Sequence, residues 1–324
     1  MERDLGFKKT IIYTLSTIII SGISLFVITK KTSHGLEAIK YVSIKKRYLI
    51  FSLISLFSFH LFDALRLKEI SKAFNVSYSF YYGFLTSLAN TLGATITPFH
   101  IGGELVTFYM LGRKKVNLHK ISSIVTIKAI TGTISFTILF PFAVYYLGLP
   151  KISKAGLLTT LAIAVLLMAF TGVLIWVVNR NPKIKEWFKK YIIMLLLFKR
   201  RGKINFFLSI IYSVMIYISF LSIAPFIVWA LGGEGTFKEL FLKQLFLFYG
   251  IFLSPTPGGS GVGEIGAVIV YENVLKGKEL LAFAILWRIM SQYLSAFIGS
   301  LVIIALHIID LKSKPIKVYQ GHRH

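Results

Sequence analysis

Long stretches of apolar residues constrain this chain more than any other feature of its sequence. Six of them approach or exceed the roughly 20 residues that a helix needs to cross a bilayer, and they fall at 10–29, 48–65, 121–147, 156–179, 204–231 and 280–309. The first stretch lacks a small-residue cleavage site, so we treat it as a retained helix and not as a signal peptide. A transmembrane β-barrel would show short alternating segments instead. We therefore predict an all-α polytopic membrane protein with six spanning helices, in which residues 1–324 form a single integral membrane domain.

Two further apolar regions, 80–111 and 240–275, are each interrupted by proline and glycine. Pro98 and Pro257 lack the backbone donor that a helix interior needs, and the neighbouring glycines weaken a helix further. Each region therefore suits a re-entrant hairpin, with one half-helix entering the membrane and a second one leaving on the same side. Two ordinary kinked helices are the alternative interpretation.

The two breaks belong to an internal repeat that also contains charged residues. Glu104 and Glu264 follow the breaks and lie 160 residues apart, and each is followed after 24 residues by a cation, Lys128 or Arg288. Charges in apolar segments are costly and often functional. A repeat with helix breaks at membrane depth is typical of the substrate site of a transporter.

The distribution of positive charge predicts how the repeats are oriented. With hairpins that return to their own side, 23 Lys and Arg residues fall on the side of the N-terminus and 12 on the other. The positive-inside rule then makes that side cytoplasmic, so both termini and the tail 311–324 are cytoplasmic. The repeats, at about 1–148 and 150–311, are consequently inverted in the membrane, and their hairpin tips can meet near its middle.

Basic residues also define the expected partners. The net charge is +24, but the cations cluster between apolar runs, which favours anionic phospholipid headgroups over nucleic acid. Residues 182–203 alternate Lys and Arg with aromatic and aliphatic side chains, and we predict an interfacial amphipathic helix there. A basic connector without fixed structure is the alternative. Arg113, Lys114 and Lys115 are candidates for attracting headgroups. The chain is also compatible with a homo-oligomer.

The hairpin tips are the predicted substrate site. A half-helix that begins near the membrane centre directs unpaired amides and the positive end of its dipole toward an anion such as phosphate. Tight helix packing is an alternative role for the glycines. The re-entrant tip residues are Pro98, His100, Gly102, Gly103, Pro257, Gly258, Gly259, Ser260 and Gly261.

The four charged residues of the repeats are candidates for substrate binding or gating. Glu104 and Glu264 could exchange partners between Lys128 and Arg288, or they could stabilise helix N-termini. We expect His100 to make an ordinary satisfied polar contact, and Asp63 with Arg66 to form a local surface pair. The chain has no cysteine, and no catalytic pair, metal site or cofactor site is expected.

The two breaks also resemble a known family. The stretches TPFHIGGELVTFYMLGRKKVNLHKISSIVTIKA and SPTPGGSGVGEIGAVIVYENVL are similar to the signature regions of the integral membrane (flippase) domain of lysylphosphatidylglycerol synthase/flippases. That domain also occurs alone in YbhN-like membrane proteins. The resemblance implies two re-entrant helix pairs and translocation of aminoacylated phospholipid. No soluble synthase domain follows residue 311, so lysyl transfer is not expected.

Together these features predict a lipid flippase of the cytoplasmic membrane. Its substrate would be an anionic or phosphate-bearing lipid, including aminoacylated ones. Two alternatives stay open, namely a proton-coupled secondary carrier for a small anion or metabolite, and a membrane enzyme acting on lipid headgroups.

Overall fold

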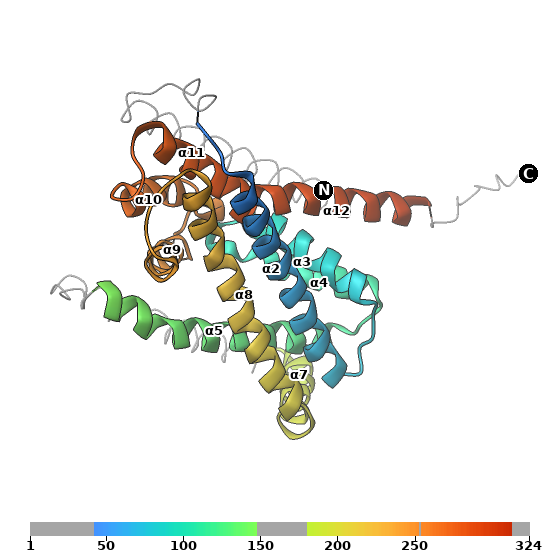
Figure 1. Cartoon of the computed structure of the whole chain (residues 1–324). Helices are drawn as coiled ribbons and strands as arrows, with labels where there is room; N and C mark the ends of the chain where they lie inside the picture. The colour runs from blue at the N-terminus through green and yellow to red at the C-terminus, as the bar shows by residue number, and fades with distance from the viewer. Residues whose placement is uncertain (1–41, 148–179, 253, 313–324) are drawn as a thin grey trace, which may run out of the picture.

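The computed structural model describes residues 42–147, 180–252 and 254–312, and within these ranges all regular structure is helical (Figure 1). The predicted spans 10–29 and 156–179 lie outside the described residues. The described helices are α2 (Lys46–Ala73), α3 (Phe80–Thr95), η2 (Pro98–His100), α4 (Gly102–Arg113), α5 (Leu118–Leu147), α7 (Pro182–Arg201), α8 (Lys203–Ala230), α9 (Phe237–Phe252), η3 (Pro257–Gly259), α10 (Val262–Tyr271), α11 (Gly277–Arg288), η4 (Ile289–Tyr293) and α12 (Leu294–Lys312).

Four described helical segments are long and apolar enough to cross a membrane: Lys46–Ala73, Leu118–Leu139, Lys203–Ala230 and Gly277–Asp310. They coincide with four of the predicted spans. The last one is a single stretch made of α11, η4 and α12, in which η4 is a π-helical turn directly after Arg288. Such turns widen a helix locally and are frequent at functional sites.

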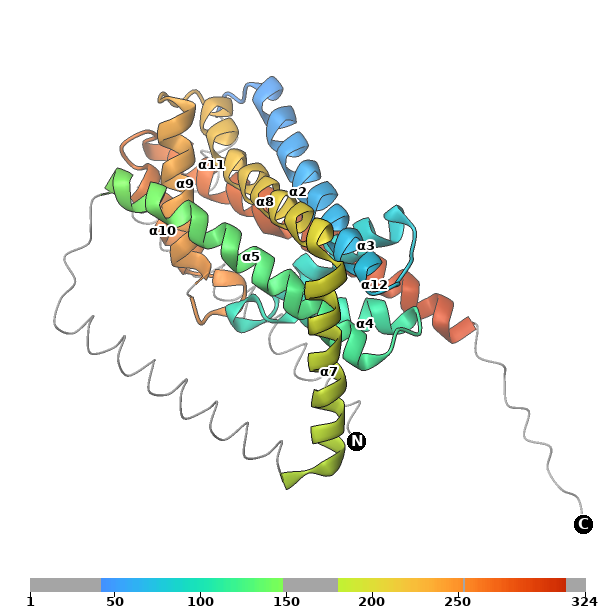
Figure 2. The same cartoon turned by 90° about the horizontal axis from the view of Figure 1, so that it is seen from below.

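Helices α2 and α8 are antiparallel and run side by side in both views (Figures 1 and 2). The amide of Lys45 donates to the carbonyl of Ala230 at 2.8 Å, which joins the start of α2 to the end of α8. A buried apolar cluster packs α8 against α9, α10 and α11, with Ile227, Tyr271 and Trp287 among its members.

A second apolar cluster gathers the opposite ends of several helices. It joins the C-terminal part of α2, the end of α4, the beginning of α5 and the end of α7, through Leu67, Leu111, Ile124 and Phe198. The basic segments 66–72, 113–120 and 180–203 therefore lie at or near one end of the molecule.

Each interrupted region forms a helical hairpin. In the first, α3 begins after Ser79, whose hydroxyl accepts a hydrogen bond from the amide of Tyr82, a common helix cap. Tyr82 then donates to the carbonyl of Met110 at 2.7 Å, which ties the beginning of α3 to the end of α4. In the second, Tyr271 at the end of α10 donates to Leu240 in α9 at 2.8 Å.

The two hairpin tips are in direct contact. The amide of Gly258 in η3 donates to the carbonyl of Thr97, just before η2, at 3.3 Å. The hairpins open toward different ends of the α2–α8 pair, since α4 ends in the cluster with Leu67 and α10 packs near the end of α8.

Helix α7 occupies most of the predicted amphipathic segment. It runs from Pro182 to Arg201 and carries a surface ion pair between Glu186 and Lys190 at 2.8 Å. The helix lies where α8 begins (Figure 1). Its interfacial position stays a prediction.

Candidate functional site

The two tips share one backbone conformation. Thr97 and Thr256 are extended before their prolines, and the residues that follow the prolines, Phe99 and Gly258, have φ of 54° and 60°. The next residues also match, with φ of 59° at His100 and 65° at Gly259. Positive φ is rare for residues other than glycine and costs on the order of 1–3 kcal/mol, so the first tip is the strained copy.

Glycine in the second tip is required by close contact with the first. A Cβ atom added at Gly258 would lie 2.6 Å from the carbonyl oxygen of Thr95 and from Nε2 of Gln292. In the first hairpin a Cβ at Gly102 would lie 2.3 Å from the carbonyl oxygen of Gly93. These contacts favour the packing role of the two glycines.

Two amides at the tips are bound within the protein. The amide of Gly102 donates to the hydroxyl of Thr97 at 2.7 Å, and that of Gly261 donates to Oε2 of Glu264 at 2.7 Å. Part of the donor capacity that was predicted for an anion is therefore already used.

Glu264 and Arg288 form a fully enclosed ion pair. Nε of Arg288 donates to Oε1 of Glu264 at 2.8 Å, and the two side chains are 3% and 0% exposed. The guanidinium also donates to the carbonyl of Gly258 and, at 2.6 Å, to Oε1 of Gln292. Tyr293 donates to Oε1 of Glu264 at 3.1 Å. This network joins η3, α10 and the π-turn η4.

Glu104 and Lys128 form the corresponding pair of the first repeat, but it is only partly satisfied. Nζ of Lys128 lies 3.1 Å from Oε1 of Glu104, and the side chains are 6% and 37% exposed. Lys128 also donates to the hydroxyl of Thr107 at 3.5 Å. Oε2 of Glu104 is buried without a hydrogen-bond partner. The two repeats thus hold one closed and one open pair.

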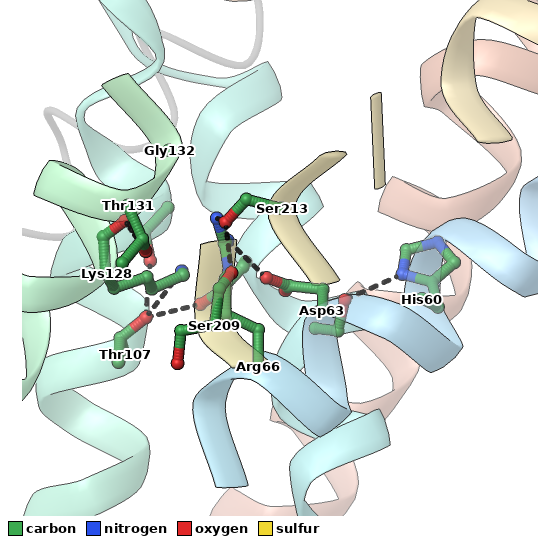
Figure 3. Close-up of polar contacts among 12 residues, drawn as sticks. His60, Asp63, Arg66, Thr107, Lys128, Thr131, Gly132, Ser209 and Ser213 are labelled. Atoms are coloured by element: carbon green, nitrogen blue, oxygen red, sulfur yellow. Dashed lines mark hydrogen bonds and ion pairs between the residues drawn. The ribbon is translucent and has the colours of Figure 1, made fainter. Parts of the chain in front are cut away.

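A third charged pair lies beside them, and here the expectation of a surface pair was wrong. Asp63 accepts from Nη2 of Arg66 at 2.5 Å, but the side chains are only 8% and 11% exposed. Figure 3 shows both between His60 on one side and Lys128 with Thr107 on the other. Arg66 also donates to Ser213 of α8 at 3.2 Å. The sequence feature that could have indicated a buried pair is the position of Asp63 and Arg66 within a helix long and apolar enough to span a membrane.

The histidines differ in how they are bound. His60 is buried between the hydroxyls of Ser87 and Ser295, at 3.0 and 2.7 Å. His100 was expected to be satisfied, but its Nδ1 is buried without a partner, while the ring stacks on Phe252.

These groups line one cavity of about 280 Å³. It lies between the tips and the α2–α8 pair, and all three ion pairs contribute to it, through Asp63, Arg66, Glu104, Lys128 and Arg288. Aromatic and aliphatic side chains form much of the remaining wall: Phe59, Phe220, Phe248, Phe252, Ile216 and Ile251. Among the described residues no group of acidic, histidine or cysteine side chains could hold a metal ion.

The remaining predicted residues lie outside the cavity lining. Arg113 donates two hydrogen bonds to Asp310 of α12, so its guanidinium is already engaged. Lys114 and Lys115 are exposed, and their attraction of headgroups stays a prediction. At the second tip Pro257, Gly259 and Ser260 are buried.

Helices long enough to span a bilayer and a charged cavity at the meeting point of two broken hairpins define a polytopic membrane protein. Residues 14–299 match the family described as the lysylphosphatidylglycerol synthase TM region, and the chain belongs to that family. It is also similar to a UPF0104 membrane protein of Archaeoglobus fulgidus, with 23% identity over 298 residues, which cover 83% of this chain and 88% of the relative.

Proposed function

We propose that this protein translocates a phosphate-bearing lipid across the cell membrane, with the headgroup passing through the cavity between the hairpin tips. The observation that carries the proposal is a cavity lined by three ion pairs and an aromatic wall. Buried ion pairs are weak evidence for stability but frequent on substrate paths through membranes. The family description, which refers to a lysylphosphatidylglycerol synthase, also favours a lipid.

The opening of the cavity favours a lipid over a soluble anion. Glu104 is the partly exposed member of the charged set, and its neighbours Ile101 and Leu105 are 58% and 62% exposed. Phe252, which lines the cavity, is 45% exposed. Exposed apolar side chains next in sequence to Glu104, and an exposed Phe252 in the cavity lining, suit a molecule with a polar head and acyl chains.

The arrangement of the hairpins supports an inverted repeat. One hairpin opens toward the end where the basic segments gather and the other toward the end of α8, while the tips touch through Thr97 and Gly258. By the positive-inside rule the basic end is cytoplasmic. Re-entrant hairpins that enter from opposite sides would allow the site to open alternately to each leaflet.

The difference between the two ion pairs assigns them different roles. The Glu264–Arg288 network is closed and acts as the fixed support of the second tip. The Glu104–Lys128 pair retains a free carboxylate oxygen and faces the cavity, so it is the pair that changes partners when a headgroup enters.

The proposal is tested by reconstituting the purified protein into vesicles that contain a fluorescent phospholipid in both leaflets. Reduction of the outer-leaflet label by dithionite then reports lipid exchange. We expect the label of the inner leaflet to become accessible at least ten times faster than in protein-free vesicles. Rates equal to those of protein-free vesicles, together with uptake of a small phosphorylated anion, would instead establish the carrier of soluble anions.

A further inference from the structure

Buried polar atoms without partners are concentrated at the cavity. Ten such side-chain atoms occur in the part of the chain that the structure describes, and six of them belong to residues that line the cavity. Buried polar groups in proteins are normally hydrogen-bonded, so a gathering of exceptions calls for an explanation. The six residues are Arg66, Asn90, His100, Glu104, Trp287 and Ser291.

The hydrogen-bonding capacity of these atoms indicates which groups a ligand of the cavity must carry. Nε of Arg66, Nδ2 of Asn90 and Nε1 of Trp287 can only donate a hydrogen bond, whereas Oε2 of Glu104, when ionised, can only accept one. The complementary ligand therefore carries several acceptors and at least one donor.

The Asn90 amide belongs to a hydrogen-bond network that includes Thr107, Lys128 and the carbonyl of Gly103. Lys128 donates to the hydroxyl of Thr107, and that hydroxyl donates to Oδ1 of Asn90 at 3.1 Å. The amide oxygen is thereby used, and Nδ2 is the free group. Asn90 is 7% exposed, so this donor has little access to solvent. The same chain of contacts brings Asn90 close to the Glu104–Lys128 pair.

The charge of the cavity defines the ligand further. Each cation that lines it, Arg66, Lys128 and Arg288, is already paired with a carboxylate of the protein. A single anion would add an uncompensated charge next to Asp63 and Glu104, and it would leave Oε2 of Glu104 without a donor. A headgroup with no net charge adds none, and charges enclosed in a low-dielectric site are costly unless they are paired.

We infer that the cavity recognises a zwitterionic head in which a phosphate is joined to an ammonium group that carries N–H donors. This rests on the proposed function and names the substrate class of the same site. The ammonium donates to Oε2 of Glu104, while Arg66 and Asn90 donate to phosphate oxygens. Trp287 supplies a further donor. A cavity of about 280 Å³ is at the small end of ligand pockets, which suits a compact head whose acyl chains stay outside.

Three labelled lipids that differ only in their heads test this inference in reconstituted vesicles. The ethanolamine head carries phosphate and N–H donors, the choline head carries phosphate and a cation without N–H, and the glycerol head carries phosphate and hydroxyls without a cation. We expect the ethanolamine lipid to cross at least ten times faster than either of the others. Equal rates, or a preference for choline or glycerol, would overturn the inferred head with phosphate and an N–H-bearing ammonium but leave lipid translocation intact. Failure to move any of the three would overturn the proposed function itself.

The variant Glu104→Gln sharpens the test because it alters selectivity as well as rate. It should slow the ethanolamine lipid at least tenfold and raise the rate of the glycerol lipid relative to it, since Lys128 then lacks its acid. Glu186→Gln is the matched control, because this glutamate on α7 is 69% exposed and does not line the cavity. An unchanged ratio of the two rates in Glu104→Gln would overturn the assignment of the ammonium to Glu104. If this variant does not fold, the comparison of the three lipids on the unaltered protein still decides the inference.

Free phosphoethanolamine tests whether the recognised phosphate and ammonium belong to a lipid headgroup or to a soluble compound. We expect it to compete with lipid translocation without being accumulated by the vesicles. Accumulation of the free compound with no movement of lipid would support the recognition chemistry and overturn the lipid as its source.

Discussion

At the level of single side chains, the two repeats carry equivalent charged pairs, but only one of these pairs is fully hydrogen-bonded. Arg288 binds Glu264, the carbonyl of Gly258 and Gln292, whereas the ammonium of Lys128 pairs with Glu104 and donates to Thr107 at the longer distance of 3.5 Å. Removing one member of a closed buried pair leaves the other charge uncompensated, while an open pair near solvent can adapt.

This difference predicts opposite effects of the two matched amide substitutions. Glu264→Gln should destabilise the protein by about 3–5 kcal/mol, because it strands the guanidinium of Arg288. Glu104→Gln should destabilise the protein less than Glu264→Gln, because the Glu104 side chain is 37% exposed, and it should reduce lipid translocation at least tenfold. Melting temperatures in detergent and rates in vesicles measure both quantities. Equal melting temperatures for the two variants would contradict the assigned roles.

A guanidinium is specifically required at position 288. Arg288→Lys keeps the charge but cannot bind a carboxylate, a carbonyl and an amide oxygen at once, because lysine lacks the planar fork. We expect a lower melting temperature and slower translocation than in the unaltered protein. Lys128→Arg is the matched exchange in the other repeat, and it should be less destabilising. The reverse order of melting temperatures would contradict this reading.

At the level of helices and turns, the contact between the two tips depends on missing side chains. Gly258 has a φ of 60°. A Cβ atom at this position would lie 2.6 Å from the carbonyl oxygen of Thr95. Gly258→Ala should therefore lower the stability by at least about 1–3 kcal/mol. Gly250 lies in α9 of the same hairpin with no atom near the position of a Cβ. Gly250→Ala should leave stability unchanged or raise it by about 0.5–1 kcal/mol. Thermal unfolding compares the pair, and equal effects would show that the tips are not tightly joined.

The same elements show how far the sequence predicts the structure. Apolar length identifies four described spans, and the proline and glycine breaks identify both tips, because these features act locally. The spacing of 24 residues identifies both ion pairs of the repeats. The buried position of Asp63 and Arg66 depends on α8 and α5, which are distant in sequence, and an i, i+3 pair is equally typical of a surface. The positive φ values of Phe99 and His100 could not be predicted from the sequence either, since neither residue is glycine.

For the protein as a whole, translocation by alternating access requires that the two hairpins open to opposite sides of the membrane. The chain has no cysteine, so single cysteines can report accessibility. Lys114→Cys, after α4, should react with a membrane-impermeant thiol reagent only from the cytoplasmic side. Lys276→Cys, between α10 and α11, should react only from the other side. Reaction of both from the same side would show that the repeats are not inverted.

If the headgroup passes through the cavity between the hairpin tips, lipid movement should stop when this cavity is filled. Thr91 lines the cavity without belonging to an ion pair, and Gly112 lies on α4 with no atom near its Cβ position. Lipid translocation should be measured for Thr91→Cys and Gly112→Cys before and after labelling with a bulky methanethiosulfonate reagent. We expect at least a tenfold loss in the labelled Thr91→Cys protein, recovery after reduction, and no change in the labelled Gly112→Cys protein. Undiminished translocation in the fully labelled Thr91→Cys protein would contradict passage of the headgroup through this cavity.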